Sequence, residues 1–326
     1  MKKYIALAIA VAIAMVAIPA GMNAGTGESL QTEEKTSAAQ QNTEDEKKEE
    51  TITVFMADTG EAIELSMRDY IISALAAEMP AVYEEAALRA QALASVTLAR
   101  YMAIHNKNNS ELEGAVISTD SKKYQAYMST EQMKERWGES FEEYYKRLTE
   151  AVDEVLPFEI TYNGEPITAA FHAISSGTTE RAENVWGREV DYLINVESEG
   201  DSLSPGYRST LTVSPEELKE TLELEPDDDD YAGWLGEGTY SDAGTLLNID
   251  ICNKNFTGAG LREAFDLRSA AIKISFDGEG FVFDVTGYGH GVGMSQYGAD
   301  YYARQGYTWR EIIRHYYPGT EITERR

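Results

Sequence analysis

Glu78 is the residue of this sequence whose position best suits proton transfer. It lies in Ala76-Ala-Glu-Met-Pro80, where a helix is predicted to end because Pro80 disfavours helical angles at the residue before it. The dipole at a helix C-terminus and apolar neighbours both disfavour a carboxylate, so we expect a raised pKa for Glu78. A carboxyl that stays protonated near neutral pH can act as a general acid. The alternative is an exposed glutamate at a helix end.

A run of hydroxyl side chains lies between a histidine and a tryptophan. The candidate residues in this stretch are His172, Ser175, Ser176, Thr179, Glu180 and Trp186. Hydroxyl groups can match the hydroxyls of a sugar, and an indole can pack on the apolar face of a pyranose ring. The stretch therefore predicts a sugar-binding loop. A Ser/Thr-rich turn beside a core tryptophan is the alternative.

The segment from Gly287 to Ala299 carries glycine at positions 287, 289, 291, 293 and 298. Glycine weakens an ordinary strand, because it costs backbone entropy and packs no side chain. We therefore expect positive φ angles or a close backbone approach. An alternating strand at 281–285 precedes the segment and a helix from 295 follows it. The turn would present His290, Ser295 and Gln296 as binding residues.

Other chemistries match these residues poorly. A Ser–His hydrolase built from Ser295 and His290 lacks the Gly-x-Ser-x-Gly signature. A phosphate-binding loop would need Gly-Lys-Ser/Thr after the glycines. A metal site through His172 and His290 stays open, although no His-Glu-x-x-His pair exists, and we expect neither metal nor cofactor. The acidic run at 227–230 lacks the glycine and closing glutamate of a calcium loop.

Helices mixed with mostly antiparallel strands are predicted around these groups, which indicates an α+β fold. We expect one catalytic domain, either compact or with two lobes around a cleft, and a loop-rich segment near 200–260. The expected strands are 51–55, 62–65, 116–118, 158–162, 167–172 and a hairpin through Asp277-Gly278. The expected helices are 66–78, 83–105, 130–155, 261–267 and 309–315.

The first fifty residues differ from the rest. Lys2 and Lys3 precede an apolar run, and the segment 4–24 is twenty-one residues long, enough for a bilayer that needs about 20. We expect 1–24 to be an uncleaved membrane anchor, with a cleaved signal as the alternative. Residues 25–50 are polar and predict a disordered acidic tether. The domain 51–326 would then lie outside the cytoplasm.

Charge and cysteine content exclude several classes of partner and site. The net charge is −28, of which the folded part from residue 51 carries −25 once the anchor (+2) and the tether (−5) are subtracted. Such a surface repels phosphate, so nucleic acid is not an expected partner. Cys252 is the one cysteine of the sequence, which leaves no intramolecular disulfide and no thiol-rich zinc site.

The chain resembles the stage II sporulation protein D family, which includes vegetative amidase enhancers. The resemblance covers about residues 51 to 326, and the glycine segment is its most specific part. The matching stretches are 76–81, 87–92, 170–172, 175–177 with Thr179 and Glu180, 185–187, 287–299 and 315–320. The chain departs from the family pattern at Val96, where the family has arginine, and at Leu98, where it has tyrosine. The loop Ser175-Ser-Gly-Thr-Thr179 stands where the family usually has Ser-Gly-Gly-His-Thr.

The resemblance implies a membrane-anchored lytic transglycosylase that acts on peptidoglycan during engulfment, with Glu78 as the essential glutamate. It also implies a preference for glycan strands stripped of stem peptides by the amidase stage II sporulation protein P, and a complex with stage II sporulation protein M. Tyr297 would join His290, Ser295, Gln296 and the 175–180 loop in lining the glycan cleft. A non-catalytic glycan-binding protein that stimulates an amidase is the alternative.

Overall fold

The computed structural model describes residues 49–107, 109–226 and 230–325. The expected anchor (1–24) and nearly all of the expected tether lie outside this part of the chain. Across the described ranges, no helix combines the length and apolar character needed to cross a membrane. Glu50, expected in the tether, accepts hydrogen bonds from Arg100 and pairs with Arg325. Ordered structure therefore starts before residue 51.

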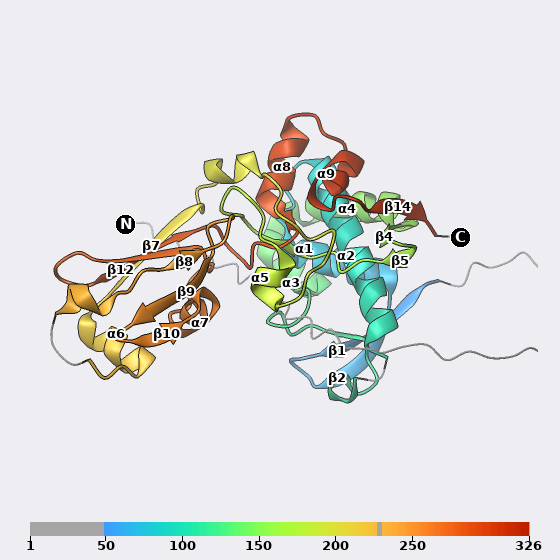
Figure 1. Ribbon diagram of the computed structural model, residues 1–326. Coiled ribbons are helices and arrows are strands. Elements are labelled where there is room, and N and C mark those ends of the chain that lie inside the picture. The colour runs from blue at the N-terminus through green and yellow to red at the C-terminus, as the bar shows by residue number, and fades with distance from the viewer. Residues whose placement is uncertain (1–48, 108, 227–229, 326) are drawn as a thin grey trace, which may run out of the picture.

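The described chain forms two lobes, each around its own hydrophobic core (Figure 1). The main body comprises residues 49–206 and 287–325, and the second lobe comprises 207–286. The main body contains β1 (Thr51–Met56), β2 (Glu61–Ser66), α1 (Met67–Glu78), α2 (Glu85–His105), η1 (Ser110–Leu112), β3 (Ile117–Ser118), α3 (Thr130–Trp137), η2 (Gly138–Ser140), α4 (Phe141–Val155), β4 (Phe158–Tyr162), β5 (Glu165–Pro166), β6 (Phe171–His172), α5 (Ala182–Trp186), η3 (Glu199–Leu203), β13 (Met294–Ser295), α8 (Gln296–Arg304), α9 (Trp309–Tyr316) and β14 (Glu321–Glu324).

The second lobe places short helices against antiparallel strands. It contains β7 (Arg208–Val213), α6 (Pro215–Leu222), η4 (Tyr231–Trp234), β8 (Thr239–Tyr240), β9 (Leu246–Ile251), β10 (Lys254–Phe256), α7 (Gly258–Ala264), β11 (Ile272–Phe276) and β12 (Phe281–Thr286). The segment 200–260 was expected to be rich in loops, and it instead supplies most of this lobe. Short elements separated by polar turns hid its periodicity, while Trp234, Leu246 and Ile251 bury their side chains in the lobe's core.

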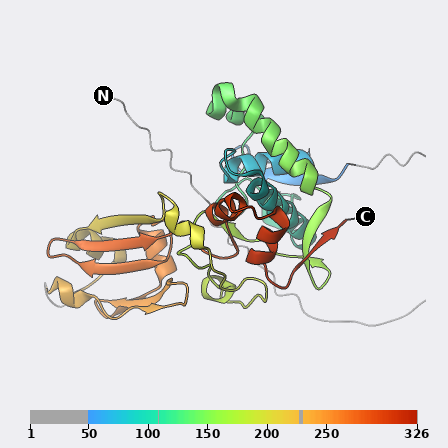
Figure 2. The same cartoon turned by 90° about the horizontal axis from the view of Figure 1, so that it is seen from above.

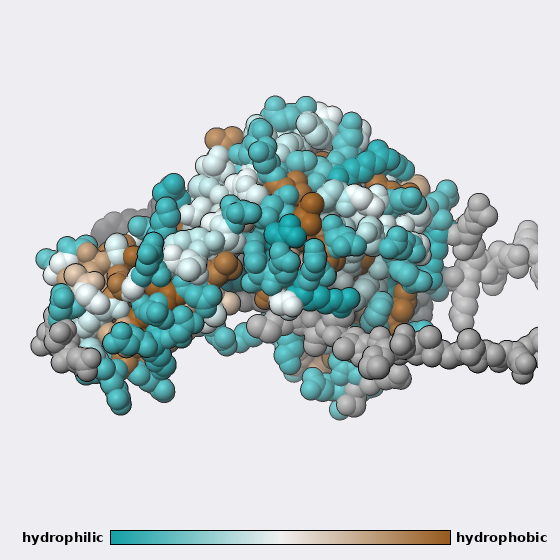
Figure 3. Space-filling view, in the orientation of Figure 1, coloured by the Kyte–Doolittle hydropathy of each residue, from teal (hydrophilic) through white to brown (hydrophobic). Residues whose placement is uncertain are grey.

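The α+β class is confirmed: the sheets are mostly antiparallel, with parallel pairing between β1 and β3 and between β6 and β13. Figure 2 shows the two lobes side by side when seen from above. On the face shown in Figure 3, hydrophilic residues cover most of both lobes. This surface fits the acidic composition, because charged side chains stay in water.

Helix α2 lies at the centre of the main body, with α1, α4, α8 and α9 packed against it. Its side chains are buried almost without interruption from Ala87 to Met102. The alanines at 87, 90, 92, 94 and 99 are all fully buried. Small side chains let neighbouring helix backbones approach closely, as the alanine-rich sequence predicted. This central helix also carries Gln91, which faces the site described below.

Three expected elements differ from the structure. The helix expected at 261–267 is α7, which begins at Gly258 and ends at Ala264. The helix expected at 130–155 is two helices, α3 and α4, because the chain turns at Gly138, which has a φ of +54°. The hairpin expected between 158–162 and 167–172 forms only beside the Asn163-Gly164 turn, where β5 pairs with β4 and the Ile167 amide donates to the Ile160 carbonyl. Further on, β6 pairs in parallel with β13 instead. Long-range pairing with the glycine segment therefore replaced the local hairpin.

Candidate active site

Glu78 is the last residue of α1. Ser66 caps the start of this helix by accepting a hydrogen bond from the Asp69 amide, and Met79 adopts extended angles before Pro80. Both ends are where the sequence placed them. Most of α1 is buried on all sides, including Ile71, Ile72 and Leu75. The helix therefore carries Glu78 into the interior, where 6% of its surface stays exposed.

The carboxyl of Glu78 lies in an environment that favours its protonated form. Burial raises its pKa to about 7, although hydrogen bonds from the Ala126 amide and the Gln296 side chain act in the opposite direction. The Ala126 amide donates to Oε1 over 2.6 Å. Because a protonated oxygen is a poor acceptor for that donor, we expect the acidic proton on Oε2. Glu78 thus has the raised pKa that the sequence predicted for a general acid.

Replacement of Glu78 by glutamine is expected to stabilise the protein, and more so as the pH rises. The pKa of Glu78 lies above its unfolded value of 4.5. Its contribution to stability is therefore full below pH 4.5 and is lost as the pH rises through about 7. Glutamine removes this titration and can still accept the Ala126 hydrogen bond. Between pH 5 and pH 8 the stability gap should grow in favour of the variant by about 2–3 kcal/mol.

Urea unfolding of both proteins at pH 5 and pH 8 measures this gap. Glu135→Gln on the exposed surface of α3 is the control, because it removes a carboxyl that lies in water. A Glu78→Gln variant that is equally stable, or less stable, at both pH values would contradict a carboxyl held in its protonated form.

Tyrosines adjoin the residues that contact Glu78, since Tyr127 follows Ala126 and Tyr297 follows Gln296 in the sequence. Tyr70, about two helical turns before Glu78 on α1, is fully buried. It stacks on Tyr127 with ring centroids 6.4 Å apart. Tyr83 packs edge-on against Tyr297 at 6.3 Å. Tyr297 was expected at the site, whereas Tyr83 and Tyr127 were missed. Their positions depend on how the turn after α1 and the segment before α3 meet α8, which local pattern does not reveal.

The glycine segment runs closely against residues 170–175. Gly287, Gly289, Gly291 and Gly293 all have positive φ angles. A Cβ atom on Gly293 would lie 2.0 Å from the carbonyl oxygen of Ala170. Both expected reasons for glycine, positive φ and close backbone approach, are therefore confirmed. The segment then forms β13 beside β6 and delivers Ser295 and Gln296 to the start of α8.

Ser295 and Ser175 share a buried carboxylate that the sequence analysis missed. Asp201 accepts hydrogen bonds from the hydroxyl of Ser295 at 2.7 Å and from the amide and hydroxyl of Ser175 at 2.8 and 2.5 Å. Burial raises the pKa of Asp201. Ser295 also caps α8 by accepting a hydrogen bond from the Gly298 amide. Both serines therefore fix the backbone that carries Gln296.

The 175–180 loop uses its polar groups inside the protein. Thr179 bonds to the backbone of Ile194 and Val196. Ser176 donates to the Ala243 carbonyl, and Glu180 accepts from Ser241 and Asn184. Ser241 and Ala243 belong to the second lobe, so this loop joins the two lobes. Its hydroxyls form these internal bonds in the described structure, in place of the free surface expected of a sugar-binding loop.

His172, His290 and Trp186 lie together beside β6. The ring of His290 is 5.8 Å from His172 and 5.6 Å from Trp186. His172 is fully buried, and burial lowers its pKa to about 4. Its Nδ1 lies 3.1 Å from the Val292 carbonyl, while its Nε2 and the indole nitrogen of Trp186 are buried without a partner among the described residues. His172 is thus a neutral ring at neutral pH.

The alternative sites gain no geometric support. Ser295 donates to Asp201, and His290 accepts from the Val292 amide, so the two do not form a nucleophile–base pair. Within the described ranges, no three His, Cys, Asp or Glu side chains gather as a metal site would require. Val96 and Leu98, where the α2 segment departs from the family pattern, are both buried. They contribute apolar packing in this chain.

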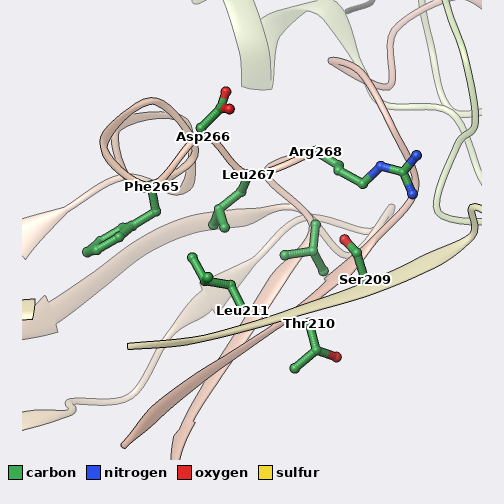
Figure 4. A pocket seen from close by; sticks show the side chains of 8 residues that line it. Ser209, Thr210, Leu211, Phe265, Asp266, Leu267 and Arg268 are labelled. Carbon is green, nitrogen blue, oxygen red and sulfur yellow. The ribbon is translucent and has the colours of Figure 1, made fainter. Parts of the chain in front are cut away.

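A shallow hollow lies away from Glu78, in the second lobe. It is lined by Ser209, Thr210, Leu211, Phe265, Asp266, Leu267, Arg268 and Val285. Figure 4 shows Leu267 and Leu211 turned toward each other, while the guanidinium of Arg268 points away. That guanidinium lies over the Tyr288 ring and donates to the Gly206 carbonyl. The hollow contains none of the expected site residues. The candidate site is therefore at Glu78, whose buried carboxyl has a raised pKa.

Known proteins of similar sequence were found over most of the chain. The family described as Stage II sporulation protein matches residues 56–162. The chain is 35% identical over 261 residues to Stage II sporulation protein D of Bacillus subtilis (strain 168), covering 80% of this chain and 75% of that protein. The protein of the same name from Bacillus amyloliquefaciens gives the same identity and coverage. The Bacillus subtilis (strain 168) amidase enhancer is 27% identical over 53% of this chain and 32% of its own length.

Proposed function

The chain belongs to the stage II sporulation protein D family, and we propose that it is a peptidoglycan lytic transglycosylase. The observation that carries the proposal is Glu78: a nearly buried carboxyl with a pKa of about 7, held by the Ala126 amide and Gln296. A general acid for a glycosidic bond needs such a group.

One carboxyl is enough for this reaction. Ordinary glycosidases use two carboxyl groups, because a second one must act as base or nucleophile. In the proposed reaction Glu78 gives its proton to the bridging oxygen as the MurNAc–GlcNAc bond breaks. The C6 hydroxyl of the same MurNAc then bonds to C1 and returns its proton to Glu78. The product is 1,6-anhydro-MurNAc, and water does not take part; the intramolecular attack has the advantage of proximity.

The surface beside Glu78 suits a neutral glycan. We place the strand along the half-buried rings of Tyr83, Tyr127 and Tyr297, because aromatic faces pack on sugar rings. We extend this surface to the half-buried rings of His290 and Trp186, whose centroids lie 5.6 Å apart. Ser175, Thr179, Glu180 and Ser295 are buried and bonded within the protein. Of these, Ser175 and Ser295 share Asp201 and so support the backbone that carries Gln296. The acidic surface also argues against a substrate rich in phosphate.

The cellular setting is part of the proposal. We propose that residues 4–24 anchor the chain in the cell membrane, with the folded part on the outer side. There it would act during engulfment on glycan strands stripped of peptides by stage II sporulation protein P, in a complex that includes stage II sporulation protein M.

The products of the reaction test the proposal. The full-length chain, purified in detergent, is incubated with peptide-free glycan strands and the ends are identified by mass spectrometry. The proposal expects anhydromuramyl ends without new reducing ends. New reducing ends would indicate a hydrolase, and intact glycan would exclude an enzyme acting on this bond.

The match to the amidase enhancer supports a second candidate function. In that case the protein would bind glycan without cutting it and would stimulate a partner amidase. Glycan pull-down without new ends, together with amidase stimulation that survives Glu78→Gln, would favour this function over the first.

A further inference from the structure

A row of buried side-chain amides leads from the centre of α2 to Glu78. Gln91 is fully buried and Gln296 is 3% exposed. The Nε2 of Gln296 lies 3.4 Å from Oε1 of Gln91, and the Nε2 of Gln91 donates to the Ser95 hydroxyl over 3.3 Å. The Gln296 side chain also donates a hydrogen bond to the Glu78 carboxyl. The row thus ends on the proposed acid.

The direction of the Gln296 amide depends on Gln91. With its nitrogen toward Ser95, Gln91 can offer only its carbonyl oxygen to Gln296. A carbonyl oxygen accepts but cannot donate, so Gln296 must turn its NH₂ group toward it. An NH₂ group has two hydrogens and can serve two acceptors. The same nitrogen of Gln296 therefore faces both Gln91 and Glu78.

We propose that Gln91 is a positioning residue, whose carbonyl fixes the Gln296 amide so that an N–H, and not a carbonyl, faces Glu78. The catalytic role of Gln91 rests on the proposed function, whereas the orientation of the Gln296 amide is independent of it. Without Gln91 the Gln296 amide could rotate by half a turn. Its carbonyl would then accept a hydrogen bond from protonated Glu78 and stabilise that form.

The ionisable group that faces Glu78 does not titrate together with it, so a change in the pKa of Glu78 can be measured by itself. Tyr70 on α1 is the group whose pKa responds to the Glu78 charge, and Tyr127 stacks on it. Burial raises the pKa of Tyr70, so its phenol stays neutral throughout the range in which Glu78 titrates. Helices α2 and α8 present neutral amides, Gln91 and Gln296. A change in the pKa of Glu78 can therefore be traced to the amides.

The direct test is the pKa of Glu78 in Gln91→Met, measured on the full-length chain by ¹³C NMR of glutamate carboxyl groups. The carboxyl resonance that is missing from the spectrum of Glu78→Gln is assigned to Glu78. Methionine keeps the size of the side chain and removes its acceptor. We expect the pKa to rise by roughly half to one unit. The Gln296 N–H, which stabilises the carboxylate, is then replaced by the Gln296 carbonyl, which stabilises the protonated acid.

Two further variants make the result specific. Thr97→Val removes buried hydrogen bonds from the same helix, to Leu93 and Ile160, without touching Gln296. It should lower stability and leave the pKa of Glu78 unchanged. In a Gln296→Met background the effect of Gln91→Met should vanish. The inference is overturned if Gln91→Met shifts the pKa no more than Thr97→Val does, or if the shift persists without Gln296.

Activity gives a second readout. In Gln91→Met the alkaline limb of the kcat/KM profile should move to higher pH by the same amount as the pKa of Glu78. A purely structural role would lower the rate at every pH and leave the limb in place. If the wild type makes no anhydromuramyl ends, the proposed function fails, while the NMR result still decides the role of Gln91.

Discussion

A Glu78→Gln variant is expected to form anhydromuramyl ends about a thousandfold more slowly than the wild type, because positioned acid–base catalysis contributes factors of roughly 10² to 10⁴. Glutamine matches the size of glutamate and can accept the Ala126 hydrogen bond, so the fold is retained. It cannot give a proton to the bridging oxygen or receive one from the C6 hydroxyl. Initial rates on peptide-free glycan, followed by mass spectrometry, measure the loss.

The matched control is Glu84→Gln, at an exposed carboxyl near the same turn. Its rate should stay close to that of the wild type. Equal rates for Glu78→Gln and the wild type would remove Glu78 from the chemistry. Together with the expected gain in stability of Glu78→Gln, a loss of activity would show that the protein sacrifices stability to hold an acid in its interior.

Gly293→Ala should cost at least about 3 kcal/mol of unfolding free energy, which is large for a single methyl group. The residue has a φ of +74°, where a side chain costs roughly 1–2 kcal/mol. The new Cβ would also meet the Ala170 carbonyl oxygen at 2.0 Å. That oxygen cannot move freely, because it accepts hydrogen bonds from the Met294 amide and the Tyr317 hydroxyl.

Gly306→Ala separates the two costs. Gly306 has a φ of +90°, but a Cβ there would meet nothing within 4 Å. Urea unfolding should therefore show a loss of only about 1–2 kcal/mol for this control. If both variants lose the same amount, close approach to Ala170 is not what requires glycine at 293.

Local features of the sequence predicted the parts of the site that depend on local geometry. Pro80 marks the end of α1, so the position of Glu78 at a helix end followed from its neighbours. The glycine spacing likewise predicted positive φ angles. The raised pKa of Glu78 followed because apolar residues around a helix end predict burial.

Features that depend on pairing between distant segments could not be predicted in this way. Asp201 lies in a short 3₁₀ helix, and nothing nearby in sequence shows that Ser175 and Ser295 would meet it. Gln91 resembles any polar residue on a helix until α8 packs against it. The hydroxyls of 175–180 suggested a sugar loop, because the sequence does not show that Ser241 and Ala243 would fold back onto them.

The second lobe leaves and re-enters the main body at one place, since Arg208 at the start of β7 pairs with Thr286 at the end of β12. A segment whose two ends are neighbours acts as an insertion, and its length can change without altering the path of the chain on either side. Changes in the length of this module would therefore leave the main body intact as long as the bonds from Ser241 and Ala243 to the 175–180 loop are kept. If the proposed function holds, adaptation to different cell walls is expected in this insertion, while Glu78 and its partners stay in the main body.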